Sequence, residues 1–134
     1  MVIVITEWAL DSYLDLLQRN VFTKSDYRTV LRPDVLLLRQ GLSPPDPKLG
    51  NSKFWSPAVD LFGRIPNTFK MKWHNLGPGK VQLRLGVVIE KDQAFLCRAW
   101  TKGSSPATNY RQLLVLRRHQ EEIQLQNYIQ RGTL

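Results

Sequence analysis

The stretch FKMKWHN, residues 69–75, alternates large apolar side chains with basic ones. Lys70, Lys72 and His74 occupy one parity, and three apolar residues occupy the other. Successive side chains of a β-strand point to opposite faces of the sheet. The stretch therefore predicts a strand that buries its apolar face and holds a row of basic side chains on the opposite face.

A turn and a second alternating segment follow this strand. GPG marks the turn, and KVQLRLGVVIE, residues 80–90, continues the apolar alternation. Pairing His74 with Lys80 places Arg84 opposite Lys70, because facing residues of an antiparallel pair share a face. The two segments predict a hairpin whose polar face is a two-stranded basic stripe.

The segment AFLCRAWTK, residues 94–102, predicts a third strand. A three-residue turn at residues 91–93 would place Arg98, Trp100 and Lys102 on the basic face, whereas a two-residue turn would exchange the faces. We favour the three-residue turn, because burying two unpaired cations is costly. The residues then expected on the core face are Phe95, Cys97 and Ala99.

The segment before the hairpin predicts one strand and two helices. Residues 2–5 are β-branched and predict a strand, and Thr6 is the expected N-cap of a helix whose apolar residues recur at helical spacing. Thr23 and Asp26 have the spacing of a capping box at the start of a second helix. Pro33 either kinks this helix or opens a new one.

Two further segments complete the chain. Residues 42–57 contain four prolines and predict a surface loop. Phe54 and Trp55 are expected to tie this loop to the core, and the alternative for Trp55 is stacking on a nucleobase. Residues 107–129 predict a C-terminal helix, with a break near His119 as a possibility.

The order of these elements predicts an α+β fold in one domain, residues 1–134. An N-terminal strand and two helices pack on a small antiparallel meander, and residues 107–134 form an extra C-terminal helical extension. A chain of 134 residues is long enough for one hydrophobic core and too short for two.

Composition narrows the classes of partner and site. Lys and Arg number 19 against 11 Asp and Glu, which favours a polyanionic partner, nucleic acid first. An anionic membrane surface, an acidic protein, or no such partner at all are the alternatives.

Cys97 is the only cysteine and is expected to be buried, so neither a disulfide nor a zinc site is predicted. The opening MVIVITEW is too short for a signal peptide or a membrane span, so we expect a cytoplasmic protein without a membrane partner.

These segments together resemble the RelE/ParE superfamily of bacterial toxins from toxin–antitoxin systems. The opening MVIVITEWALDSYLDL is similar to the first strand and helix of the family, and FKMKWHN is similar to the Lys-x-Lys strand of RelE-type ribonucleases. VVIEKDQAFLCRAWTKG, residues 87–103, resembles the last hairpin of the family. The resemblance extends from Val2 to about Tyr110.

The resemblance implies roles for particular residues. Lys70 and Lys72 match the paired lysines of the catalytic strand, and Arg84 is the best match to the arginine of the next strand. Lys102 matches the basic residue that ends the last strand, and Tyr110 matches the tyrosine that stacks on a substrate base.

The implied function is that of a toxin that cleaves mRNA on the ribosome without a metal or other cofactor. An acidic antitoxin would silence it by covering the basic face or by displacing the C-terminal helix. The chain departs from the family pattern in a longer hairpin loop, in Gly103 where a basic residue is expected, and in the extended loop and C-terminal helix. These departures leave a ParE-like gyrase inhibitor, an inactive member, or a plain nucleic-acid-binding module as alternatives.

The chemistry of RNA cleavage also follows from the residues themselves. Cleavage without a metal needs a base for the 2′-hydroxyl, cations for the charge on phosphorus and an acid for the leaving oxygen. Crowding lowers the pKa of Lys70 or Lys72 toward that of a base, Arg84 can bind the phosphate, and His74 can act as acid or base unless it is simply solvated. An idle solvated face is the alternative, but the stripe has no acidic residue before Glu90. The predicted substrate-binding residues are Arg98, Trp100, Lys102 and Tyr110.

Overall fold

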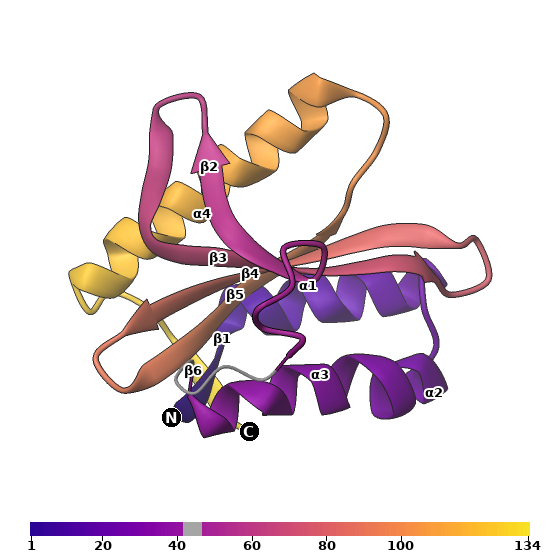
Figure 1. The fold of residues 1–134 in the computed structure, drawn as a ribbon, viewed down its shortest axis with the longest axis horizontal. Coiled ribbons are helices and arrows are strands. Elements are labelled where there is room, and N and C mark those ends of the chain that lie inside the picture. The colour runs from indigo at the N-terminus through magenta and orange to yellow at the C-terminus, as the bar shows by residue number, and fades with distance from the viewer. Residues whose placement is uncertain (42–46) are drawn as a thin grey trace.

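The computed structural model describes residues 1–41 and 47–134, which form one mixed sheet with helices on both faces (Figure 1). The six strands of the described residues lie in the order β2-β3-β4-β5-β1-β6. The elements are β1 (Val2–Thr6), α1 (Glu7–Gln18), α2 (Lys24–Asp26), a π-helical turn (Tyr27–Leu31), α3 (Arg32–Leu36), a 3-10 turn (Leu37–Gln40), β2 (Trp55–Asp60), β3 (Gly63–Leu76), β4 (Val81–Glu90), β5 (Gln93–Thr101), α4 (Pro106–Gln124) and β6 (Gln130–Thr133).

The predicted mixture of helices and strands is confirmed, but the predicted antiparallel meander is wrong for the sheet as a whole. Only β2, β3, β4 and β5 pair in sequence as an antiparallel meander, while β1 pairs parallel to β5. Ile3 and Val4 of β1 belong to hydrophobic clusters on opposite faces of the sheet. A strand buried on both faces has a continuous apolar sequence, which explains the run of β-branched residues at residues 2–5.

The predicted N-terminal caps are confirmed. The Thr6 hydroxyl accepts a hydrogen bond from the backbone N–H of Ala9 at 3.2 Å and donates one to the carbonyl of Leu96 at 2.7 Å. Thr23 and Asp26 form the reciprocal bonds of a capping box. Thr6 therefore both begins α1 and fixes the end of β1 against β5.

Of the two outcomes expected at Pro33, the opening of a new helical element is the one found, because α3 begins at Arg32. A π-helical turn at residues 27–31 directly precedes α3, and Pro33 lies in the first turn of α3. Proline lacks a backbone N–H, so the wider turn accommodates a position at which a regular helix would lose a hydrogen bond. The helical segment ends at Gly41, whose φ of 77° is the left-handed value expected at a helix end.

The register predicted for the first hairpin is wrong by two residues. Lys72 lies opposite Arg84, and Lys70 lies opposite Gly86. The strands close at the pair Leu76 and Val81, and the register shifts between residues 73 and 76, which the alternating pattern alone could not indicate. A shift of two residues keeps each side chain on its predicted face, so the basic side chains still form a stripe on one face of the hairpin.

The predicted three-residue turn between β4 and β5 is also wrong. Glu90 lies opposite Gln93, which makes a two-residue turn, but the register shifts again between Gly86 and Val87 and leaves Cys97 as an extra residue. This β-bulge restores the predicted parity for the end of β5, where Arg98 and Trp100 share the face of Arg84. The predicted core face is wrong for Phe95 and Cys97, which pack toward α4 in the same cluster as Trp100. Ala99 packs in the other cluster, the one that contains α1.

The loop predicted at residues 42–57 is wrong at its end, because β2 begins at Trp55. Residues 42–46 of that prediction lie outside the described residues. Phe54 and Trp55 are each 8 % exposed, and Trp55 stacks on Phe69 with ring centroids 4.9 Å apart. The interpretation of these aromatic residues as anchors in the core is confirmed.

The C-terminal prediction of a helix to residue 129 is wrong beyond Gln124. α4 passes His119 without a break, Gln126 then takes a left-handed φ of 57°, and β6 pairs antiparallel with β1. β6 thus covers the outer edge of β1, and the two chain ends lie close together (Figure 1).

The two faces of the sheet are covered by different helices (Figure 1). One core cluster joins α1 and α3 to the sheet, and the other joins α4 to it. Gly86 lies beneath Leu116 of α4, and a Cβ atom at Gly86 would clash with the Leu116 side chain. The glycine thus allows α4 to pack closely on β4.

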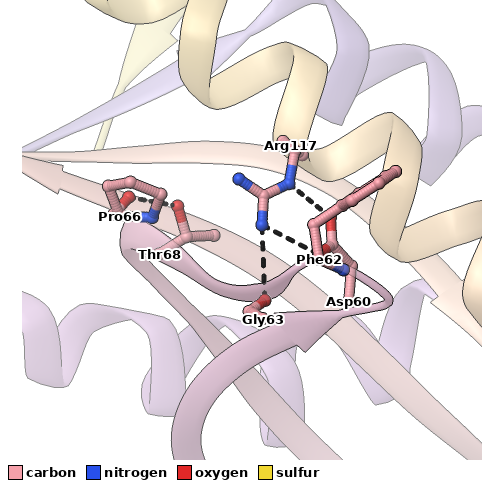
Figure 2. Close-up of polar contacts among 6 residues, drawn as sticks. All are labelled: Asp60, Phe62, Gly63, Pro66, Thr68 and Arg117. Carbon is pink, nitrogen blue, oxygen red and sulfur yellow. Dashed lines mark hydrogen bonds and ion pairs between the residues drawn. The ribbon is translucent and has the colours of Figure 1, made fainter.

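An ion pair joins α4 to the hairpin of β2 and β3 (Figure 2). Two nitrogens of the Arg117 guanidinium donate to the two carboxylate oxygens of Asp60, and Nη2 also donates to the carbonyl of Gly63 at 3.3 Å. The Asp60 carboxylate accepts a further bond from the N–H of Phe62 at 2.8 Å, which orders the turn.

Within the described residues, no helix has both the length and the apolar character that a membrane span requires.

Candidate functional site

Four of the predicted basic residues gather in a groove of about 560 Å³ between the sheet and the first half of α4. We call it the basic groove and define it by its cations Lys70, Lys72, Arg84 and Lys102. The other residues that line it are Trp100, Gly103, Ser104, Pro106, Asn109, Tyr110 and Leu113.

Strand geometry explains why these side chains meet. Lys70 and Lys72 are two residues apart in β3 and therefore share a face. Lys72 lies opposite Arg84 in β4, and Arg84 lies opposite Trp100 in β5, so the three side chains form a row across three strands. Lys102 continues the basic face just beyond the end of β5. The alternation of apolar and basic residues in the sequence therefore places these cations on one face of the sheet.

The surroundings of the two lysines lower the pKa of both side chains. Burial lowers the pKa of Lys70 below its usual value of 10.5, and the charges of Lys72, Arg84 and Lys102 lower it further. Burial likewise lowers the pKa of Lys72, with added repulsion from Arg84 and Lys102. A lysine in such a place is a better general base than a solvated lysine.

Two of the four groove cations, Lys72 and Arg84, are held by neutral oxygens rather than by carboxylates. Arg84 is 5 % exposed, and its guanidinium donates to the Leu83 carbonyl at 3.2 Å and to Gln82 Oε1 at 2.9 Å. Lys72 Nζ donates to the carbonyl of Ser52. In the part of the chain that the structure describes, none of the four cations forms an ion pair with a carboxylate. The local positive charge is therefore not neutralised by these residues.

The aromatic residues of the groove occupy different depths. Trp100 is 5 % exposed and forms part of the wall. Tyr110 also lines the groove but is 43 % exposed. Of the two, Tyr110 is the better placed to stack on a nucleobase.

Two predicted site residues do not line the groove. His74 is exposed at the far end of β3, and its Nε2 atom lies 3.0 Å from the Lys53 carbonyl. Arg98 shares the face of the groove cations but lines a neighbouring pocket between α1 and α4. The other six, Lys70, Lys72, Arg84, Trp100, Lys102 and Tyr110, all line the groove.

Sequence reasoning missed the polar groups that α4 and the preceding loops supply. Asn109 donates from Nδ2 to the Gly103 carbonyl at 3.3 Å, while its buried Oδ1 has no hydrogen-bond partner among the described residues. No sequence pattern indicated the Ser52 carbonyl either, although it accepts a hydrogen bond from Lys72 Nζ. An isolated glycine inside a strand pattern indicates a close approach or a bulge, so Gly86 was the available signal that α4 packs here.

The arrangement suits a phosphodiester. A fully charged arginine and a charged lysine can hold a phosphate, and a neutral lysine can accept a proton from a neighbouring hydroxyl. Separately, within residues 1–41 and 47–134, no group of three or more His, Cys, Asp or Glu side chains could hold a metal ion.

Comparison with protein-family models, curated protein sequences and solved structures gave no significant match. The geometry and charge of the basic groove therefore provide the basis for a functional proposal.

Proposed function

We propose that this chain is the toxin of a toxin–antitoxin pair, a RelE-type ribonuclease that cleaves mRNA on the ribosome without a metal ion. The observation that carries the proposal is the convergence of four cations, without a carboxylate partner among the described residues, in a groove that lowers the pKa of Lys70 and Lys72. Such convergence costs folding free energy and is typical of sites that bind and transform anions.

The proposed reaction is an internal transfer at phosphorus. One lysine, Lys70 or Lys72 in its neutral form, accepts the proton of the ribose 2′-hydroxyl while the 2′-oxygen attacks phosphorus. The bond from phosphorus to the 5′-oxygen breaks, and a proton from the other, charged lysine passes to that oxygen. The products are a 2′,3′-cyclic phosphate and a 5′-hydroxyl.

The remaining groove residues bind rather than transfer protons. Arg84 stays charged and stabilises the phosphorane oxygens, because its guanidinium loses a proton far less readily than a lysine. Lys102 holds a neighbouring phosphate, and Tyr110 stacks on a base of the RNA. An acidic antitoxin would inhibit by covering the basic groove, for which its charge is complementary.

The test is to induce the protein in bacteria and to map mRNA 5′ ends. The wild type is compared with the double variant Lys70→Ala, Lys72→Ala. A matched control, Lys24→Ala with Lys53→Ala, removes the same charge from exposed positions outside the groove. We expect new 5′ ends within translated regions for the wild type and the control, and their loss in the groove variant.

Other outcomes would overturn the proposal. Growth arrest without new 5′ ends would favour a non-nuclease target such as gyrase. Binding of nucleic acid with neither arrest nor cleavage would favour a plain binding module. New ends that persist in the groove variant would place the chemistry elsewhere.

A further inference from the structure

A pocket of about 190 Å³ lies on the face of the sheet opposite to the basic groove. Successive side chains of a strand point to opposite faces, so Trp73 of β3 points away from Lys72. In β4, Leu83 and Leu85 likewise point away from Arg84. We call this space the apolar pocket and define it by residues from three elements, Ala9 and Tyr13 of α1, Tyr27 and Leu31 of the π-helical turn, and Trp73 of β3.

The lining of the apolar pocket suits neither an ion nor water. Among the described residues that line it, none has a charged side chain, and most are aliphatic or aromatic. Its polar side-chain groups are the hydroxyls of Tyr13 and Tyr27 and the indole N–H of Trp73. That N–H already donates to Asp34 Oδ2 at 2.8 Å. Because a buried water needs about two to four polar partners, the pocket favours an uncharged, apolar occupant.

The apolar pocket is larger than the spaces that normal packing leaves empty. Its inner wall belongs to the core, since Phe22 and Leu83 are each 2 % exposed and Trp73 is 6 % exposed. Protein interiors contain few voids larger than a water molecule, because an empty space deprives its walls of van der Waals contacts. An engineered cavity of about 150 Å³ lined by Leu, Ile and Phe in another protein binds benzene. The apolar pocket is therefore large enough for a molecule of that size.

One side of the apolar pocket combines an aromatic cluster with an uncommon helical turn. Tyr13 packs against Tyr27 with ring centroids 5.0 Å apart and against Phe22 with ring centroids 5.5 Å apart. Tyr27 and Leu31 are the first and last residues of the π-helical turn, and both line the pocket. π-helical turns are rare and occur frequently at functional sites. The turn is thus a second, independent indication of a ligand site at this place.

We infer that the apolar pocket binds a small, uncharged and predominantly apolar molecule of about the size of benzene. The lining determines the chemical class of the ligand, and the volume determines its size. The inference goes beyond the proposed function and does not depend on it, because the pocket and the basic groove lie on opposite faces of β3 and β4. Binding without RNA cleavage, or cleavage without binding, would separate the two proposals.

The test is an NMR titration of the alanine methyl signals of the full chain with benzene and with benzoate. Ala9 and Ala99 line the apolar pocket, whereas Ala58 is buried in the cluster that contains α4 and Ala107 is exposed on α4. Bound benzene should shift the Ala9 and Ala99 signals saturably and leave those of Ala58 and Ala107 in place. Benzoate adds a charge to the same ring, so it should bind at least about tenfold more weakly. Benzene should also raise the midpoint of urea denaturation, because it binds only the folded state.

A filling variant tests whether benzene binds in this space. Ala9→Leu places a larger side chain in the apolar pocket and should weaken benzene binding at least about tenfold. Ala107→Leu makes the same change at an exposed position of α4 and should retain the wild-type affinity. If Ala9→Leu does not fold, Ala99→Val fills the pocket from β5 and should also weaken binding.

Three outcomes would overturn the inference. Ala9 and Ala99 signals that do not respond to benzene up to its solubility in water would show that the pocket takes no such ligand. An equal response to benzene and benzoate would contradict the apolar character of the site. Wild-type affinity in a folded filling variant would place the binding of benzene elsewhere.

Discussion

Arg117 and Arg84 both lie between the sheet and α4, yet their surroundings differ. Arg117 meets the Asp60 carboxylate through two nitrogens and the Gly63 carbonyl through one (Figure 2). Arg84 is more deeply buried but donates only to the neutral oxygens of Leu83 and Gln82. One arginine is neutralised by its partner, and the other keeps its positive charge without a carboxylate among the described residues.

The difference separates a stabilising contact from a candidate site. The hydrogen bond from Arg117 lowers the pKa of Asp60, so the folded state favours the charged pair. In the basic groove, burial and mutual repulsion lower the pKa of Lys70, so the folded state disfavours the charge that the lysine would carry in water. An arrangement that opposes the charge of its own residues is expected where those residues act on a ligand.

Replacing Arg84 should give the largest effect on activity. Arg84→Met keeps much of the buried volume but removes the proposed phosphate contact, so the rate of RNA cleavage should fall by about 10²–10³-fold. The measurement is the rate at which new mRNA 5′ ends appear after induction. Arg118→Met, at an exposed position of α4, is the control and should retain the wild-type rate. Equal rates for both variants would show that Arg84 has no special role.

Replacing Asp60 should give the largest effect on stability. Asp60→Asn leaves Arg117 without its charged partner and should lower the free energy of unfolding by about 1–3 kcal/mol in urea denaturation. Asp15→Asn breaks an exposed pair with Arg19 and should change this free energy by less than about 1 kcal/mol. Equal losses in the free energy of unfolding for Asp60→Asn and Asp15→Asn would contradict this prediction.

The contribution of Asp60 should depend on pH with a definite sign. Its pKa in the folded state is lowered from the usual 3.8, so its stabilising effect is complete above that value and declines as pH falls through the folded pKa. The stability difference between wild type and Asp60→Asn should stay constant from neutral pH to about pH 5. Below pH 3.8, the usual pKa of an aspartate, this stability difference should shrink. A difference that grows on acidification would contradict the assignment.

The smallest effect is expected at His74. This residue lies outside the basic groove, so His74→Gln should change the cleavage rate by less than about twofold. The same mapping of 5′ ends provides the measurement. A loss comparable to that of Arg84→Met would mean that the substrate extends to the far end of β3.

Local patterns predicted the parts of the fold that depend on neighbouring residues. The alternation in FKMKWHN placed Lys70 and Lys72 on one face, and the capping residues Thr6 and Thr23 begin their helices as expected. The parallel pairing of β1 with β5 depends instead on contacts between segments about 90 residues apart. No local pattern specifies such a pairing.

The face on which Arg98 lies was predicted by an energetic argument and not by the length of the turn. The cost of burying unpaired cations correctly placed Arg98 with Arg84, although the predicted turn was wrong. The bulge at Cys97 compensates for the shorter turn, and only the energetic argument, not the counting of residues, anticipated the result. The Asp60–Arg117 pair joins residues 57 positions apart and had no local signal at all.

The role of the basic groove is tested most sharply by measuring both stability and cleavage on one variant, Lys70→Met. We expect that removing this partly buried charge leaves the midpoint of urea denaturation unchanged or raises it, while RNA cleavage falls at least about 100-fold. A variant that loses stability but retains cleavage would show that the basic groove supports the fold rather than the chemistry, and would contradict the central claim.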